Sequence, residues 1–226
     1  MSSIPLNLQA VRQRIESATR AAGRPPQSVR LVAVSKTFPP EAVREAAQAG
    51  LRDFGENYVQ EAIAKRAELA DLSDVRWHLI GHLQTNKARV AAGRFALIQS
   101  VDSIRLAEAL AKIAPAQAAL IEVNVAREPQ KSGADPKDAL DVIQAVASTL
   151  DLRGLMAMGP SHGDPTPAFV ELRMLREEAE QRLGKSLPIL SMGMSGDFEA
   201  ALAAGSTMLR LGQVLFGPRP ARSIVM

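Results

Sequence analysis

Lys36 is the residue of this 226-residue chain whose position most favours covalent chemistry. It ends the apolar segment 31–35, and Pro39 and Pro40 follow shortly after, so a lysine held at the end of a rigid strand is predicted. Desolvation at such a position disfavours the charged ammonium. A neutral lysine amine forms an imine with an aldehyde or ketone. The alternative is a structural lysine whose stem lies along the strand while its amine reaches water.

A glycine- and serine-rich segment has the composition of an anion-binding loop. Ser195 lies between Gly193 and Gly196, and a helix is predicted over residues 197–204 directly after them. Glycines let the backbone approach a ligand closely, and the N–H groups at a helix start attract an anion such as phosphate. Gly212, after the last predicted strand, allows a second close approach. The alternative is a glycine-rich turn with an N-cap serine.

Arg210 is a charged residue inside the apolar segment 208–211. A guanidinium keeps its proton, so Arg210 needs an acceptor in that environment. Two kinds of acceptor are open at this point. One is a neighbouring carboxylate such as Asp53 or Glu122, and the other is a ligand nitrogen or oxygen near the axis of the fold.

The histidines give weaker signals. His78 alternates with Trp77 in a predicted strand, which is typical of a hydrogen-bonding core residue, whereas His82 follows that strand and is placed to contact a ligand. These two histidines are four residues apart, but on a strand and its loop that spacing does not direct both at one ion. With no cysteine in the chain either, we expect no metal site.

Short apolar segments alternate with amphipathic helical segments along the chain. Helices are clearest over 136–150 and 167–183, with Asp135 and Thr166 as the expected N-caps. Eight strands separated by roughly 20–30 residues, each followed by a helix, predict an α/β fold of the parallel (β/α)8 TIM-barrel type. No linker or composition break appears, so a single domain over residues 1–226 is expected. The predicted strands are 30–35, 51–54, 77–80, 96–99, 119–124, 154–158, 189–191 and 207–211.

A barrel would gather the chemically distinctive residues at one end. Active sites of TIM barrels lie at the C-terminal ends of the strands. Lys36 ends the first predicted strand, Asn57 follows the second, and Ser195 and Arg210 belong to the seventh and eighth. The residue types and the fold therefore predict one site.

Composition excludes several classes of partner. A net charge of +3, from 27 basic and 24 acidic residues that are interspersed, gives no argument for nucleic acid. No apolar stretch approaches the length of a membrane span, and the N-terminal residues follow the spacing of an ordinary helix rather than a secretory signal. We expect a cytoplasmic protein without a membrane partner, and a monomer by default.

The chain resembles the pyridoxal-phosphate homeostasis protein family over nearly its whole length. An imine-forming lysine, a phosphate cradle and a positioned arginine also suit pyridoxal 5′-phosphate (PLP), which uses a lysine imine and a partner for its ring nitrogen. The matching segments are Ala33-Val34-Ser35-Lys36, Phe54-Gly55-Glu56-Asn57-Tyr58, Trp77-His78-Leu79-Ile80-Gly81-His82-Leu83-Gln84-Thr85-Asn86-Lys87, Ser191-Met192-Gly193-Met194-Ser195-Gly196-Asp197 and Arg210-Leu211-Gly212-Gln213-Val214-Leu215-Phe216-Gly217.

The resemblance implies a fold-type III barrel like the N-terminal domain of alanine racemase, with PLP held as a lysine aldimine. It implies that Lys36 carries the cofactor and that Arg210 meets its ring nitrogen. The implied ring and phosphate contacts are Asn57, His82, Met194, Ser195, Gly212 and Gln213. Many relatives are expected to have a small hydroxyl residue at 213, so that here the backbone N–H of Gln213 would serve instead.

The resemblance favours a PLP-binding homeostasis protein, without catalytic residues, over an enzyme. An arginine beside the ring nitrogen keeps it unprotonated and weakens the ring as an electron sink. A racemase needs a base on each face of its substrate. The only tyrosine, Tyr58, lies in the second-strand loop, and we expect no additional β-domain to supply another. Apo PLP-dependent enzymes are the expected recipients of the cofactor. The alternatives are a small PLP-dependent amino-acid racemase and a cofactor-free aldolase.

Overall fold

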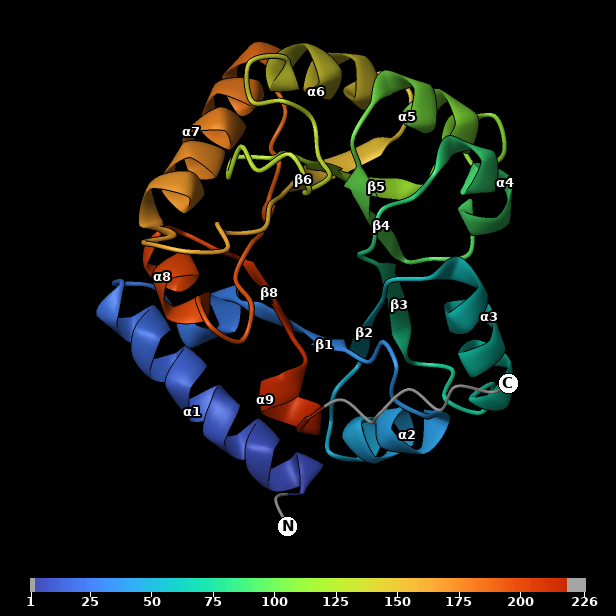
Figure 1. The fold of residues 1–226 in the computed structure, drawn as a ribbon, viewed down its shortest axis with the longest axis vertical. Helices are drawn as coiled ribbons and strands as arrows, with labels where there is room; N and C mark the ends of the chain where they lie inside the picture. Colours follow the sequence, from blue (N-terminus) through green and yellow to red (C-terminus); the bar gives the residue numbers. More distant parts are fainter. Residues whose placement is uncertain (1–2, 219–226) are drawn as a thin grey trace.

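A computed structural model describes residues 3–218, and its centre is a closed barrel of eight parallel strands (Figure 1). Each strand pairs with the next along the chain, and β8 pairs with β1 to close the barrel. The predicted TIM barrel is confirmed. The strands are β1 (Arg30–Val34), β2 (Asp53–Glu56), β3 (Arg76–Leu79), β4 (Leu97–Val101), β5 (Ala118–Glu122), β6 (Asp151–Met156), β7 (Ile189–Ser191) and β8 (Met208–Leu211).

The helices form an outer ring around the strands (Figure 1). No helix within residues 3–218 combines the length and the apolar character that crossing a membrane requires. The helices are α1 (Ile4–Ala21), α2 (Pro40–Gln48), α3 (Val59–Glu68), α4 (Ala88–Ala91), α5 (Ile104–Ala111), α6 (Ala139–Ala147), α7 (Thr166–Leu183), α8 (Phe198–Ala203) and α9 (Gln213–Phe216), with 3-10 turns η1 (Pro26–Ser28) and η2 (Thr85–Lys87).

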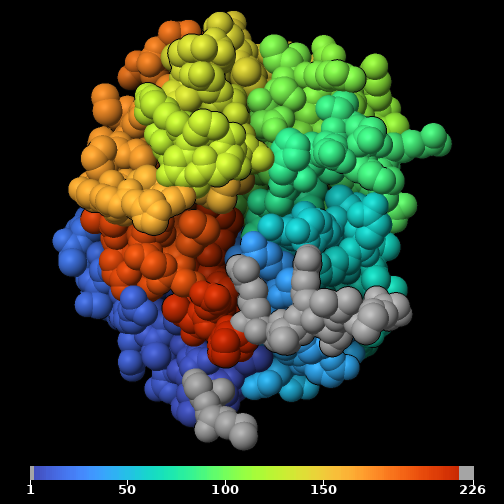
Figure 2. All heavy atoms as spheres, in the orientation of Figure 1, coloured from blue at the N-terminus to red at the C-terminus, as the bar shows by residue number. Residues whose placement is uncertain are grey.

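Helix α1 precedes the first strand and packs against the last helices of the described chain. It contacts α8 and α9, and Figure 2 shows its blue atoms directly beside the red ones of the late segments. Leu8, Val11 and Ile15 bury the face of α1 that their spacing predicts. Arg14 also lies 4.6 Å above the ring of Phe198. An ordinary opening helix, as predicted, thus packs across the junction between the first and last barrel units.

Successive side chains of each strand point alternately out of and into the barrel, and this alternation separates two apolar clusters. In β8, Leu209 and Leu211 belong to the large cluster between strands and helices, whereas Met208 belongs to a small second cluster. That small cluster, here called the barrel plug, consists of Val32, Leu97, Leu120, Met156 and Met208. Arg210 is two residues after Met208 and so shares the inner face of β8.

Several predicted element starts differ from the structure; β2, for example, begins at Asp53 rather than 51, and α8 begins at Phe198 rather than 197. Three further starts differ as follows. β6 begins at Asp151 rather than 154, because Gly154 lies inside the strand, paired with Ile189 of β7. α6 begins at Ala139 rather than 136, since the Asp135 carboxylate accepts the Lys137 N–H and forms a turn instead of a helix cap. Thr166 is the first residue of α7 rather than its N-cap, and its N–H donates to the Asp164 carboxylate.

Candidate functional site

A cavity of about 260 Å³ lies at the C-terminal ends of the strands. Seven of the eight predicted site residues line it, although they come from four separate parts of the chain. The lining residues are Val34, Lys36, Asn57, Ile80, Met156, Met158, Met194, Ser195, Gly196, Arg210, Gly212 and Gln213. The closed barrel brings these segments together, since it places the ends of β1, β2, β7 and β8 around one opening.

His82 is the predicted site residue that does not line this cavity. Its side chain is half exposed, and its Nδ1 lies 3.2 Å from the Asp102 carboxylate. The structure therefore places His82 beside Asp102, outside the group formed by the other seven.

The backbone on the N-terminal side of Lys36 is held by several hydrogen bonds. Ser35 is fully buried, and its N–H donates to the Gly55 carbonyl oxygen at 3.0 Å. Its hydroxyl donates to Oε1 of Glu56 at 2.7 Å, and its carbonyl accepts from Nζ of Lys65 at 2.9 Å. Lys36, which is partly exposed, thus extends into the cavity from a fixed strand end.

Thr37, directly after Lys36, has an unusual backbone conformation. Its φ is +68°, a left-handed value that β-branched residues rarely adopt. The N–H of Thr37 donates to Oε1 of Glu61 at 2.8 Å, which holds this turn in place. Strained backbone of this kind persists where the surroundings determine it, and it is concentrated at functional sites. The turn fixes the direction in which the chain leaves Lys36.

A buried ion-pair network lies behind the lysine. Nζ of Lys65 donates to Oε1 of Glu56 at 2.6 Å and to Oε1 of Glu61 at 3.2 Å. Lys65 and Glu56 are almost entirely buried, and burial raises the pKa of Glu56, although Lys65 opposes this rise. With the bond to the Ser35 carbonyl, all three ammonium hydrogens of Lys65 are used. The network joins α3 to the end of β1.

Arg210 has backbone and hydroxyl acceptors rather than a carboxylate partner. Its NH1 donates to the carbonyl and the hydroxyl oxygens of Ser191 at 2.8 and 2.7 Å, and its NH2 donates to the Ala157 carbonyl at 2.8 Å. Across residues 3–218 no ion pair of Arg210 is present, so neither of the candidate carboxylates, Asp53 and Glu122, is its direct partner. Burial lowers the pKa of Arg210 to about 10, against the opposing charge of Glu122.

A chain of buried hydrogen bonds continues from Arg210 through the barrel. The Ser191 hydroxyl donates to Oε1 of Gln99 at 2.7 Å, and Nε2 of Gln99 lies 3.1 Å from Nδ1 of His78. Nε2 of His78 lies 2.9 Å from Oδ1 of Asp53. With the Gln99 amide donating to Nδ1, the imidazole hydrogen is on Nε2 and points to the Asp53 carboxylate. The prediction of His78 as a hydrogen-bonding core residue is confirmed.

The glycine- and serine-rich segment presents backbone donors to the cavity. Its helix, α8, starts at Phe198, with Asp197 as the N-cap residue, and the Met194 N–H donates to the Asp197 carboxylate at 2.5 Å. Within the described part of the chain, the N–H groups of Ser195, Gly196 and Gly212 have no acceptor. All three residues line the cavity, so these donors are available to a bound anion.

Glu122 is a buried carboxyl group near this end of the barrel. Burial raises the pKa of Glu122 to about 7, the charge of Arg210 opposes the rise, and the charge of Asp102 adds to it. Its Oε2 is buried without a hydrogen-bond partner in the described structure. The folded protein therefore binds the proton of the Glu122 carboxyl group more tightly than the unfolded chain does. The stability that protonated Glu122 contributes is fully present below about pH 4.5 and is lost as the pH rises through about 7.

Replacing Glu122 with glutamine is expected to reduce the fall in stability between about pH 5 and about pH 8. A raised pKa of this size corresponds to on the order of 3 kcal/mol of that fall. Urea unfolding of the cofactor-free protein at both pH values measures it. The same pH dependence in Glu122→Gln and wild type would show that Glu122 ionises without penalty.

Comparison with known proteins assigns the family. Residues 6–220 match the family described as alanine racemase, N-terminal domain. A pyridoxal phosphate homeostasis protein of Pseudomonas aeruginosa is 46% identical over 225 residues, covering 97% of both chains. Another, of Escherichia coli K12, is 40% identical over 97% of this chain and 98% of the relative. The chain belongs to the pyridoxal phosphate homeostasis protein family.

Solved structures agree with this membership of the pyridoxal phosphate homeostasis family. PipY of Synechococcus elongatus, solved with PLP bound, is 41% identical, with a TM-score of 0.80 over 92% of this chain and 100% of PipY. The alanine racemase of Corynebacterium glutamicum is 20% identical with a TM-score of 0.71, and this chain covers 63% of it. That second likeness shows a shared fold, as the expected fold-type III barrel requires.

Proposed function

We propose that this protein binds pyridoxal 5′-phosphate in the cavity at the C-terminal ends of the strands and acts in intracellular PLP homeostasis. The observation that carries the proposal is the convergence of Lys36, Arg210 and the backbone donors around Ser195 and Gly212 on one cavity. PLP has an aldehyde, a ring nitrogen and a phosphate. An amine, a guanidinium and a set of N–H donors are the groups that complement these three.

Each of the seven predicted residues that line the cavity then has a role that follows from its position. Lys36 bonds the aldehyde covalently, and Asn57 and Met194 lie beside the ring. Ser195, Gly212 and Gln213 hold the phosphate, chiefly through backbone N–H groups. Because a backbone donor is present whatever the side chain, glutamine at position 213 is compatible with this role.

Arg210 favours retention of the cofactor over catalysis. Three bonds to Ser191 and Ala157 fix its guanidinium in the barrel wall. A guanidinium facing the ring nitrogen keeps that nitrogen unprotonated, which reduces the ability of the ring to accept electrons. Tyr58, the only tyrosine, is 54% exposed and is not among the cavity-lining residues. These features support a homeostasis protein rather than the alternative of an amino-acid racemase.

The remaining part of the proposal concerns delivery. We infer that a single-domain, cytoplasmic monomer passes the cofactor to apo forms of PLP-dependent enzymes. The partial exposure of Lys36 supports this, because a cofactor bonded there stays accessible from outside the barrel.

Two measurements on the wild-type protein test the function. Added PLP is expected to produce a visible absorption band of a lysine-bound cofactor, and the loaded protein is expected to leave L-alanine unracemised. A protein without the band would contradict cofactor binding. Sustained D/L interconversion would instead favour the racemase.

A bulky residue at position 212 is expected to remove most of the preference for PLP over pyridoxal. A Cβ at Gly212 would lie 3.3 Å from the Val34 carbonyl oxygen, so the branched side chain of Gly212→Val displaces this segment from the cavity wall. Loss of a charge-assisted hydrogen bond to the phosphate costs about 1.5–3 kcal/mol. The ratio of the Kd values for PLP and pyridoxal, compared between variant and wild type, measures this loss. Gln213→Ala, which keeps its N–H, is the matched control. A Gly212→Val variant with wild-type preference would place the phosphate elsewhere.

A further inference from the structure

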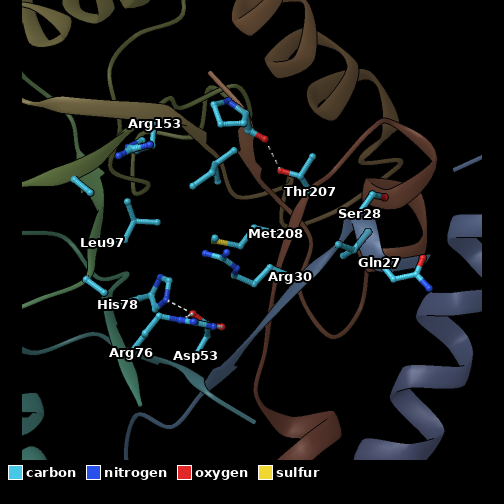
Figure 3. Close-up of a pocket in the computed structure, with 15 residues that line it drawn as sticks. Gln27, Ser28, Arg30, Asp53, Arg76, His78, Leu97, Arg153, Thr207 and Met208 are labelled. Atoms are coloured by element: carbon cyan, nitrogen blue, oxygen red, sulfur yellow. Dashed lines mark hydrogen bonds and ion pairs between the residues drawn. The ribbon is translucent and has the colours of Figure 1, made fainter. Parts of the chain in front are cut away.

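A second and larger hollow, of about 720 Å³, lies at the opposite end of the barrel, where the strands begin (Figure 3). Arg30, Asp53 and Arg76 are the first residues of β1, β2 and β3, and all three line it. The size is that of a small-molecule site. The N-terminal face of a TIM barrel ordinarily serves stability, so a hollow rather than a packed layer at this end requires an explanation. It is called here the basal pocket.

The basal pocket is positively charged. Arg30, Arg76 and Arg153 extend into it from three different strands, and Asp53 is the one carboxylate among its lining residues within 3–218. Figure 3 shows these arginines around the opening. Arg153 has an ion pair at 2.7 Å with Asp151, which does not line the pocket. Across residues 3–218, no carboxylate lies within ion-pair distance of Arg30.

Asp53 is paired with Arg76 and His78 and forms no ion pair with Arg30 or Arg153. Its Oδ1 accepts from Nε of Arg76 at 2.8 Å and from Nε2 of His78 at 2.9 Å, and its Oδ2 accepts from NH2 of Arg76 at 2.6 Å. Burial would raise the pKa of Asp53, but the hydrogen bonds from Arg76 and His78 hold it well below its usual range. The carboxylate is therefore part of a fixed wall, and the charge of Arg30 remains for a ligand.

The inner wall of the pocket is apolar. Leu97 and Met208 line it, and both belong to the barrel plug. Met156, a third plug residue, lines the cavity at the C-terminal ends of the strands, here called the upper cavity. The plug thus separates the two cavities, and each has its own ligand-facing surface.

We propose that the basal pocket binds a small organic anion, with a phosphate or carboxylate between Arg30 and Arg153 and an apolar body against Leu97 and Met208. Arginine binds the oxygens of either group in a planar, two-point geometry. The apolar wall adds burial that a bare inorganic ion lacks. The site is independent of the cofactor site and of the function proposed for it.

Phenyl phosphate is a suitable probe. Inorganic phosphate and phenol serve as controls that carry only its charged part or only its apolar part. Backbone amide resonances of the 15N-labelled protein, followed during titration with and without saturating PLP, locate binding at either end of the barrel. We expect saturable shifts at Arg30, Arg76 and Leu97 in both samples, with phenyl phosphate binding more tightly than either control. Shifts confined to Lys36 and Ser195, or no saturable shift, would overturn the proposal.

Replacing arginines distinguishes binding in the basal pocket from nonspecific electrostatic attraction of an anion to the protein surface. The double variant Arg30→Gln/Arg153→Gln is expected to bind phenyl phosphate about tenfold more weakly or worse, because it loses charge-assisted contacts. Arg89→Gln/Arg105→Gln removes the same charge from exposed positions outside the pocket and is expected to bind as wild type does. Both altered pocket arginines are exposed, so the fold should survive, and Arg30→Glu provides a second variant. Equal affinity in all these variants would exclude an arginine-built site.

Discussion

Replacing Lys36 with alanine is expected to abolish covalent retention of PLP and its visible absorption band, while the barrel stays folded. Lys36 is the lysine that lines the upper cavity. Without its amine, the cofactor is held only by noncovalent contacts, and most of it should be lost during gel filtration. Borohydride reduction of the wild type, followed by peptide mapping, should place the pyridoxyl mass on Lys36.

The control is Lys87→Ala, which removes an exposed lysine of η2 outside the cavity lining. It is expected to keep the wild-type spectrum. A pyridoxyl mass on Lys87 or another lysine, with Lys36 unmodified, would contradict the assignment and leave Lys36 as a structural residue at a strand end.

The barrel was predictable because its signals are local and repeated. Eight apolar segments alternate with helices, and their number and spacing alone indicate the fold. Knowledge of the fold then predicted where strand-end residues would meet. For this reason Lys36, Asn57, Ser195 and Arg210 were correctly expected around one cavity, although they are far apart in the chain.

The supporting contacts were not predictable, because they depend on side chains that meet only after folding. The sequence gives no sign that Gln99 bonds both Ser191 and His78, or that Arg210 uses a hydroxyl and carbonyls instead of a carboxylate. His82 illustrates the converse. Its position after β3 was identified correctly, but loop geometry directs its ring to Asp102 rather than to the cavity.

Lys65 is the most consequential of the residues that sequence reasoning missed. The Glu61–Lys65 spacing of four was a visible sign of a helical ion pair, but such pairs usually lie on exposed surfaces and contribute little. Here α3 packs over the end of β1, and Lys65 is 4% exposed, with Glu56 at 0%. Its ammonium is joined to the Ser35 carbonyl, one residue before Lys36.

Replacing Lys65 with methionine is therefore expected to destabilise the cofactor-free protein by about 3–5 kcal/mol, the cost of leaving a buried charge without its partner. Glu56 would retain only the Ser35 hydroxyl, and the Ser35 carbonyl would lose a donor. Urea unfolding measures the loss. Lys112→Met, at an exposed position, is the matched control and should change stability by less than about 0.5 kcal/mol.

A second variant and a change of pH identify the buried charge as the cause. In Lys65→Met/Glu56→Leu no charge remains buried without a partner, so much of the stability should return, as apolar replacements of buried pairs are often neutral. Burial already raises the pKa of Glu56, and without Lys65 the rise should be larger. The loss in Lys65→Met should accordingly shrink as the pH falls and Glu56 takes up a proton. A loss that is independent of pH, and that the double variant does not relieve, would assign the effect to packing of the lysine stem against α3 and β1 instead.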